Sequence, residues 1–139
     1  ESTRIGTIYL PPALWNKLAH ANVIELTLPM QERVLLLLET YRHFLEQPES
    51  LSDSLEPLGK LRGRAQLQSW HEQITRGAWP DFVTSLLENH YDLCYRRPGS
   101  ADSNYPPPAY QLALPDHSFE SYRDAARILS EAGKLPAAP

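Results

Sequence analysis

The sequence lacks most of the features that announce a membrane, secreted or metal-binding protein. Its single cysteine, Cys94, excludes an internal disulfide and any CxxC metal site. No apolar run approaches the length of a membrane span, and no signal peptide is visible. The formal charge of -4 supplies no global basic field of the kind that attracts nucleic acid. These absences favour a protein of the reducing cytoplasm with no membrane partner.

A complete catalytic constellation is also missing from the sequence. There are no paired carboxylates, no Ser/His/Asp order and no HExxH motif. The pair Gly59-Lys60 is not part of a Walker A loop, because the GxxxxGK[ST] spacing is absent. Cys94 follows an apolar helical pattern, so we expect a buried structural cysteine and not a nucleophile. We therefore predict no catalytic residue and no metal ligand in this chain.

The clearest pattern that is present is a strand leading into a helix. Residues 23–28 form a short β-branched and apolar run, which Pro29 ends because proline has no amide hydrogen for a sheet. Apolar residues then return at helical spacing over 30–45. This βα unit is typical of α/β folds, in which ligands bind at the carboxyl ends of the strands. We therefore expect a ligand near Pro29 and Arg33.

The rest of the chain predicts further helices and a second strand. We expect helices after Pro11-Pro12, over 64–76, from 79 to about 95 with Tyr91 and Cys94 facing inward, and over 119–132. Residues 49–63 read as a polar stretch with a short helical turn at 54–58, and residues 110–114 as a strand. The fold class is therefore α/β, mostly helical with about two parallel strands. Its parts are 1–48 (βα), 49–98 (helical insertion) and 99–139 (loop, final strand and helix).

Several polar groups are candidate binding positions, each with a structural alternative. Arg33 can bind a phosphate bidentately, or it can form a surface ion pair with Glu32 or Glu39. The polar stretch 1–6 is expected to be a loop whose Ser2 and Arg4 contact a phosphate; the alternative is a frayed terminus.

Two further groups suit nucleic acid. Lys60, Arg62 and Arg64 lie in a glycine-containing segment that can follow a phosphate backbone. The alternative is that this segment is a solvated loop. His90, Tyr91 and Tyr95 can form a patch that stacks a base, while the alternative is a core tyrosine pair with Asp92 as a cap.

The ends of the sequence suggest a part of a larger protein. The chain begins at Glu1, its only methionine is Met30, and a buried parallel strand requires neighbours on both sides. We expect the carboxyl-terminal part of a longer chain. A complete small α+β domain after propeptide removal is the alternative.

Several segments together resemble the tRNA 2-selenouridine synthase family. The segments that carry the resemblance are Glu1-Ser2-x-Arg4-Ile5-Gly6 with Leu10-Pro11, the strand with Pro29-x-x-x-Arg33, and Trp70, Gly77 and Phe82-Val83-x-x-Leu86-Leu87-x-x-His90-Tyr91-Asp92-x-x-Tyr95. The match spans roughly residues 1–97, and the last forty residues fit only by the order of a strand and a helix.

This resemblance implies an enzyme that replaces sulfur by selenium in wobble 2-thiouridine of tRNA. Family members use selenophosphate, and the proposed route has an S-geranylated intermediate, with geranyl diphosphate as a substrate. Rhodanese-like and P-loop segments of the same protein would lie upstream. This chain would be the back half of the P-loop nucleotide-kinase-like domain with its helical insertion, and it would be inactive by itself. It would bind phosphate through Ser2, Arg4 and Arg33, and tRNA through Lys60, Arg62, Arg64, His90, Tyr91, Tyr95 and Arg96.

Two other readings stay open. A small-molecule kinase-like domain would have a Walker A loop upstream and no rhodanese-like cysteine before it. A non-catalytic helical interaction domain would be self-contained and would expose an apolar patch.

Overall fold

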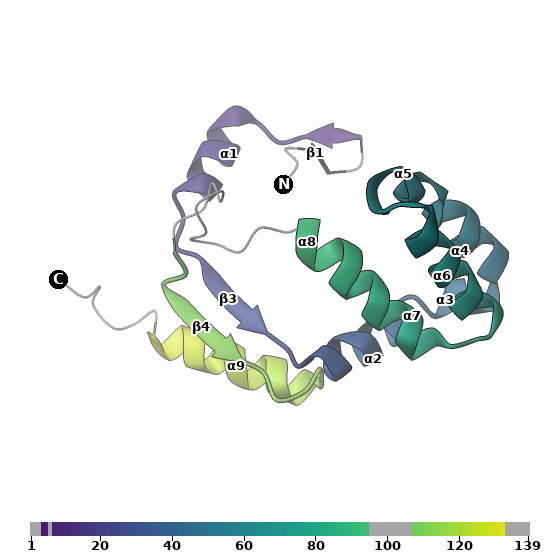
Figure 1. The fold of residues 1–139 in the computed structure, drawn as a ribbon. Helices are drawn as coiled ribbons and strands as arrows, with labels where there is room; N and C mark the ends of the chain where they lie inside the picture. Colours follow the sequence, from purple (N-terminus) through teal and green to yellow (C-terminus); the bar gives the residue numbers. More distant parts are fainter. Residues whose placement is uncertain (1–3, 6, 95–106, 133–139) are drawn as a thin grey trace. The chain divides into compact units, whose positions relative to one another are not determined.

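A computed structural model describes residues 4–5, 7–94 and 107–132, and the chain divides into two compact units (Figure 1). The first unit is built from the chain up to Thr27 and from Cys94 to Ala113. The second unit is built from Leu28 to Leu93 and from Leu114 onward. Most of the described residues are helical, and the fold includes a small parallel sheet, as predicted for an α/β class.

The parallel sheet belongs to the first unit. Strand β3 (Ile24–Thr27) pairs in parallel with β4 (Tyr110–Ala113), in a register that places Ile24 beside Tyr110 and Thr27 beside Ala113. Across this pair, Gln111 Nε2 donates a hydrogen bond of 2.8 Å to Glu25 Oε2. The prediction of two adjacent parallel strands is therefore confirmed.

The first unit also contains a short antiparallel pair and one helix. Strands β1 (Arg4–Ile5) and β2 (Ile8–Tyr9) pair with each other, and α1 (Pro12–Ala19) follows with proline in its first turn. The expected loop over 1–6 is thus wrong for Arg4 and Ile5. Apolar Ile5 and Ile8 are paired directly, and a β-branched pair of this kind suits a strand.

The second unit consists of helices. These are α2 (Met30–Thr40), α3 (Arg42–Glu46), α4 (Pro48–Leu55), the 3-10 turn η1 (Glu56–Leu58), α5 (Gly59–Arg62), α6 (Arg64–Thr75), α7 (Trp79–Leu86), the π-helical turn η2 (Leu87–Tyr91), α8 (Asp92–Cys94) and α9 (Phe119–Ala132). The sequence predicts only a short helical turn at 54–58 within 49–63, whereas nearly all of this stretch is helical. Pro48 lies in the first turn of α4, where a proline loses no helical hydrogen bond.

Two predicted helices are interrupted. The helix expected over 30–45 divides at Tyr41, whose φ of -106° and ψ of 29° leave the helical region. The helix expected from 79 to about 95 changes from α to π geometry at Leu87. A π turn shifts the rotational phase of the residues that follow it. Tyr91 and Cys94 are accordingly exposed, and the expectation that they face inward is wrong.

The core of the second unit is centred on Trp70, whose side chain is fully buried. Packed in this core are Val34, Leu51, Leu55, Ile74, Phe82, Val83 and Leu87, from α2, α4, α6, α7 and η2. Trp70 Nε1 donates to Ser85 Oγ at 3.1 Å, so its buried donor is satisfied. This core holds α2, α7 and η2 together; Arg33 lies in α2, and His90 and Tyr91 lie in η2.

Helix α9 begins where the sequence predicts. Ser118 is the residue before its first turn, and Ser118 Oγ accepts a hydrogen bond of 3.2 Å from the backbone N–H of Ser121. Phe119, the first residue of this helix, is 80% exposed, whereas Ala125 is buried. The predicted helix end at Gly133 lies outside the described residues.

Candidate nucleic-acid interface

Arg33 and Asp92 form a bidentate ion pair within the second unit. Arg33 Nη1 donates to Asp92 Oδ2 at 2.9 Å and Nη2 to Oδ1 at 2.5 Å, across 59 residues of sequence. Their side chains are 32% and 41% exposed. The hydrogen bond to Asp92 raises the pKa of Arg33 above its ordinary value. The predicted ion-pair partners, Glu32 and Glu39, are thus replaced by Asp92.

Arg62 contacts the same helical segment through His90. Arg62 Nε donates to His90 Nδ1 at 3.2 Å, and Nη2 donates to the backbone carbonyl of His90 at 3.3 Å. Because Nδ1 accepts, the proton of the neutral imidazole lies on Nε2. Burial, and then the charge of Arg62, lower the pKa of His90. His90 is therefore a neutral side chain near pH 7.

His90 belongs to the π turn η2, and Asp92 directly follows this turn. The rings of His90 and Tyr91 meet edge to face, with centroids 5.1 Å apart and planes at 71°. Tyr91 is 43% exposed. Asn89 Nδ2 donates to the backbone carbonyl of Ser85 at 2.9 Å. The turn thus presents an aromatic ring at the surface beside a histidine of fixed tautomer.

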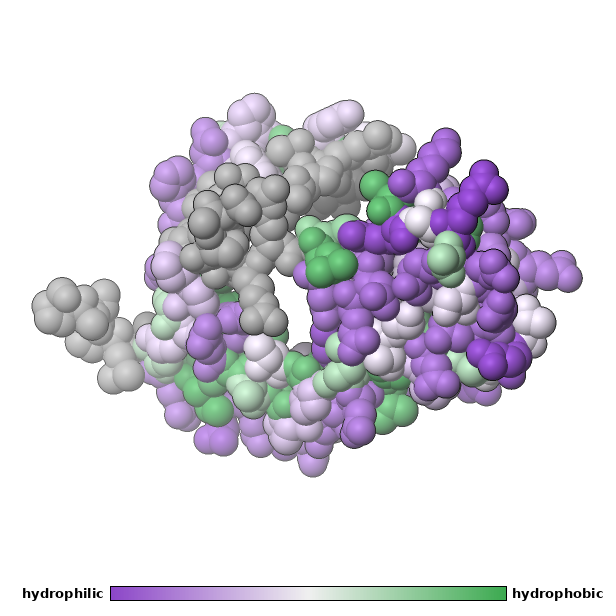
Figure 2. Space-filling view, viewed as in Figure 1, coloured by the Kyte–Doolittle hydropathy of each residue, from purple (hydrophilic) through white to green (hydrophobic). Residues whose placement is uncertain are grey.

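The basic segment around α5 has two exposed cations. Lys60 and Arg64 are exposed, whereas Arg62 between them is half-buried by its contact with His90. No ion pair within the described ranges involves Lys60 or Arg64. Figure 2 shows a largely hydrophilic surface over α4, α5 and α6, and Leu61 is 69% exposed among these residues. Of the three predicted cations, the structure leaves two at the surface and directs the third toward η2.

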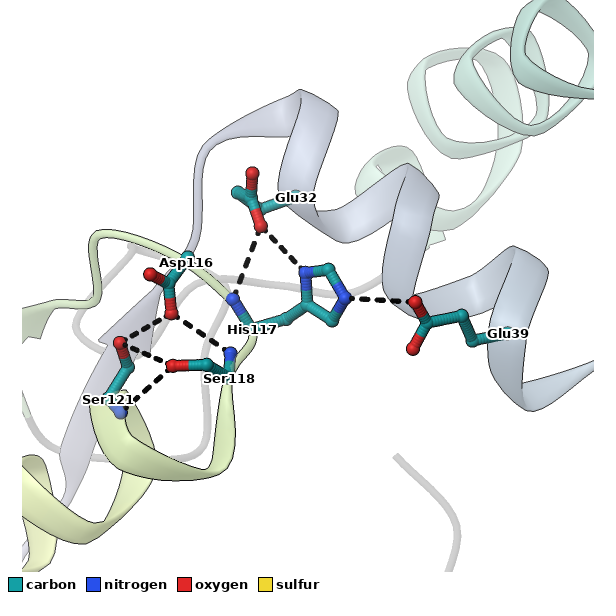
Figure 3. A network of polar contacts seen from close by, with 6 residues as sticks. All are labelled: Glu32, Glu39, Asp116, His117, Ser118 and Ser121. Carbon is teal, nitrogen blue, oxygen red and sulfur yellow. Dashed lines mark hydrogen bonds and ion pairs between the residues drawn. The ribbon is translucent and has the colours of Figure 1, made fainter.

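A second polar cluster, which the sequence analysis missed, lies beside the first turn of α2 (Figure 3). His117 approaches Glu32 Oε2 with its Nδ1 at 2.6 Å, and its Nε2 lies 3.5 Å from Glu39 Oε1. The hydrogen bond to Glu32 raises the pKa of His117, and Glu39 adds to this effect. His117 follows β4 just as Arg33 follows β3. The rule that placed ligands at strand ends therefore also pointed to His117.

Asp116 in this cluster is held as an anion. Its Oδ1 accepts hydrogen bonds from the backbone N–H of Ser118 at 2.9 Å and from Ser121 Oγ at 2.5 Å. Hydrogen bonds from Ser118 and Ser121 lower the pKa of Asp116 to about 2. The cluster has two roles in the fold: it starts α9 and joins the loop before α9 to α2.

The other predicted binding residues are Ser2, Arg4, Tyr95 and Arg96. Ser2, Tyr95 and Arg96 lie outside the described residues. Arg4 lies in β1 of the first unit, where only its backbone is described. Cys94 is exposed, which corrects the expectation of a buried cysteine.

Searches for other kinds of site gave negative results. In residues 4–5, 7–94 and 107–132, no group of three or more His, Cys, Asp or Glu side chains could hold a metal ion. None of the described helices is long and apolar enough to span a membrane. Comparisons with protein-family models, curated proteins and solved structures found no match.

Proposed function

We propose that this chain is the carboxyl-terminal part of a tRNA 2-selenouridine synthase and that it contributes RNA and phosphate binding. The complete enzyme would replace sulfur by selenium in wobble 2-thiouridine, by way of an S-geranylated intermediate and with selenophosphate as donor. It would act in the cytoplasm. The observation that carries the proposal is the ion pair between Arg33 and Asp92. It brings together two motifs of the resemblance, Pro29-x-x-x-Arg33 and His90-Tyr91-Asp92.

Contact between the two motifs supports a shared role for them. Each motif is weak by itself, because short patterns of this kind occur by chance. Two segments separated by 59 residues that meet through a bidentate contact are more specific than either pattern. The parallel pair β3–β4, joined through the helices of the second unit, is also compatible with the back half of a P-loop domain. Rhodanese-like and Walker A segments would then belong to the same protein.

The RNA contacts are assigned by exposure and charge. Lys60 and Arg64 are exposed cations that can neutralise phosphates, and Tyr91 offers a ring on which a base can stack. Stacking on an aromatic ring contributes about 1–3 kcal/mol per base. Ser2 and Arg4 remain predicted phosphate ligands, for selenophosphate or geranyl diphosphate. Tyr95 and Arg96 remain predicted tRNA contacts.

The assignment is tested by tRNA binding to the full-length protein. The affinity for a tRNA that carries wobble 2-thiouridine is measured over a series of salt concentrations, for wild type and for K60Q/R64Q. The slope of log K against log salt is negative. Loss of two phosphate contacts should make it less negative by about 2, since each contact releases close to one counterion. The matched control is R123Q/R127Q, which removes two exposed arginines from α9. This control should leave the slope unchanged.

Other outcomes identify the competing functions. A wild-type protein that transfers phosphate from ATP to a small molecule and ignores tRNA would support the kinase-like domain. A protein that binds neither tRNA nor ATP would support the interaction domain. An equal effect of both double variants would show general electrostatic attraction and contradict the assigned surface.

A further inference from the structure

We infer that Arg33 and Arg62 are positioning residues, which hold the helical segment from Leu87 to Asp92 from two sides and thereby place Tyr91 at the RNA surface. This inference rests on the proposed function and gives two of its predicted ligand residues a different role. Both arginines act on the same short segment, one on Asp92 and the other on His90.

The contact of Arg33 is suited to positioning because both partners are geometrically fixed. The guanidinium fork and the carboxylate match in a planar, bidentate arrangement that specifies orientation as well as distance. Arg33 precedes Val34, which is 5% exposed in the core, so the backbone that carries the arginine is anchored. The positive charge of Arg33 is already balanced by Asp92, which reduces its attraction for a phosphate.

The contact of Arg62 fixes the other side of the segment. It binds both the ring and the backbone carbonyl of His90, so it restrains the main chain of η2 directly. Arg62 is the last residue of α5, and Gly63 follows with a φ of +89° and ends that helix. Arg62 therefore lies at the end of α5, where Gly63 turns the chain out of the helix.

The π geometry makes these restraints necessary. A π turn has wider hydrogen-bonded rings than an α-helix and occurs mostly as a single turn, often at functional sites. Each residue of an α-helix is rotated by about 100° from the previous one, as 3.6 residues per turn require. Return of η2 to α geometry would therefore turn Asp92 away from Arg33 and move Tyr91 to another face. The ion pair and the π turn stabilise each other.

Charge exchange in the full-length protein separates positioning from phosphate binding. The variants are R33D, D92R and the double exchange R33D/D92R. Amide hydrogen exchange over residues 87–94 reports the position of the segment, and tRNA affinity reports function. Each single variant should speed exchange at least tenfold and weaken tRNA binding. The double exchange should restore most of both, because a carboxylate and a guanidinium still meet.

Several outcomes would overturn the inference. If the double exchange restores protection but not tRNA binding, Arg33 is a phosphate ligand. If the single variants alter neither exchange nor binding, the ion pair positions nothing. R33Q and D92N provide a milder pair should a charge reversal prevent folding. A wild-type protein that fails to bind tRNA contradicts the proposed function, while the exchange rates still decide whether Arg33 positions the segment.

Arg62 and its neighbour Arg64 provide a matched comparison. R62Q should speed amide exchange over 87–91 and leave the salt slope of tRNA binding unchanged. R64Q should make that slope less negative by about 1 and leave amide exchange unchanged. The opposite pattern for R62Q, with a less negative salt slope and unaltered amide exchange, would make Arg62 a phosphate ligand.

Discussion

His117 contacts one carboxylate oxygen of Glu32 through two of its nitrogens. The ring Nδ1 lies 2.6 Å from Glu32 Oε2, and the backbone N–H donates to the same oxygen at 3.3 Å. A loop that lies 85 residues away in sequence is thereby joined to the first turn of α2. Glu39, about two turns further along the same face of α2, approaches the other ring nitrogen. Both nitrogens of the ring face carboxylates, which favours the imidazolium form.

The first prediction concerns the pH dependence of this contact. The pKa of His117 is raised in the folded state, so its contribution to stability is fully present below the unfolded value of about 6.5. That contribution is lost as pH rises through the higher folded value. An NMR titration of the His117 ring should therefore give a midpoint above 6.5. E32Q should lower this midpoint, whereas E46Q, on the exposed end of α3, should leave it unchanged.

The second prediction concerns the start of α9. Ser118 accepts a hydrogen bond from the backbone N–H of Ser121, so S118A should lower the free energy of unfolding by about 1 kcal/mol, as is typical of a lost N-cap.

Asp116 has a pKa of about 2, so the stability that it contributes is present above about pH 3.8 and is lost as the pH falls toward 2. Urea unfolding at several pH values measures both effects. A cost for D116N that is the same at pH 7 and pH 2 would contradict the assignment.

The third prediction concerns the buried indole of Trp70. S85A removes the acceptor for Trp70 Nε1 and for the amide of Gln66, so it should cost about 1–3 kcal/mol of unfolding free energy. W70A should cost about 3–5 kcal/mol, because it leaves a large cavity. S69A, at an exposed position of α6, is the control and should change stability by less than about 0.5 kcal/mol. Equal stability of S85A and S69A would mean that the indole donor finds another partner.

The fourth prediction concerns Gly63, between α5 and α6. Its φ of +89° and ψ of 156° lie in a region that residues with a Cβ rarely adopt. No atom lies within 4 Å of a Cβ built at this position, so any cost of G63A is one of backbone conformation. G63A should destabilise the protein by about 1–3 kcal/mol in thermal or urea unfolding. The control A65S, at an exposed position of α6, should have little effect.

Local patterns in the sequence predicted the local structure well. The strands at 24–27 and 110–113 and the helices at 64–75 and 119–132 lie within a few residues of their predicted limits. Each has a clear apolar period and a proline, glycine or serine at its boundary, so neighbouring residues suffice to define it. The prediction was incomplete over 49–63, where only a turn at 54–58 was expected, because Pro48 and Gly59 begin helices.

The candidate site was predictable only in part. Arg33, Arg62 and His90 were recognised by residue type, but their partners are set by tertiary packing. Asp92 lies 59 residues from Arg33, and no local pattern connects them. The orientation of Tyr91 was predicted wrongly because a constant α-helical period was assumed, whereas the π turn changes the phase. His117 was overlooked because no local pattern connects it with Glu32, which lies 85 residues away in sequence.

The most direct test of the proposed function is the nucleoside composition of tRNA from cells that carry this gene. Total tRNA from the wild type, from a deletion strain and from that strain complemented with the full-length gene is digested and analysed by mass spectrometry after growth with selenium. The proposal predicts 2-selenouridine in the wild type, only 2-thiouridine in the deletion strain, and recovery of 2-selenouridine on complementation. Unchanged 2-selenouridine in the deletion strain would contradict the proposal.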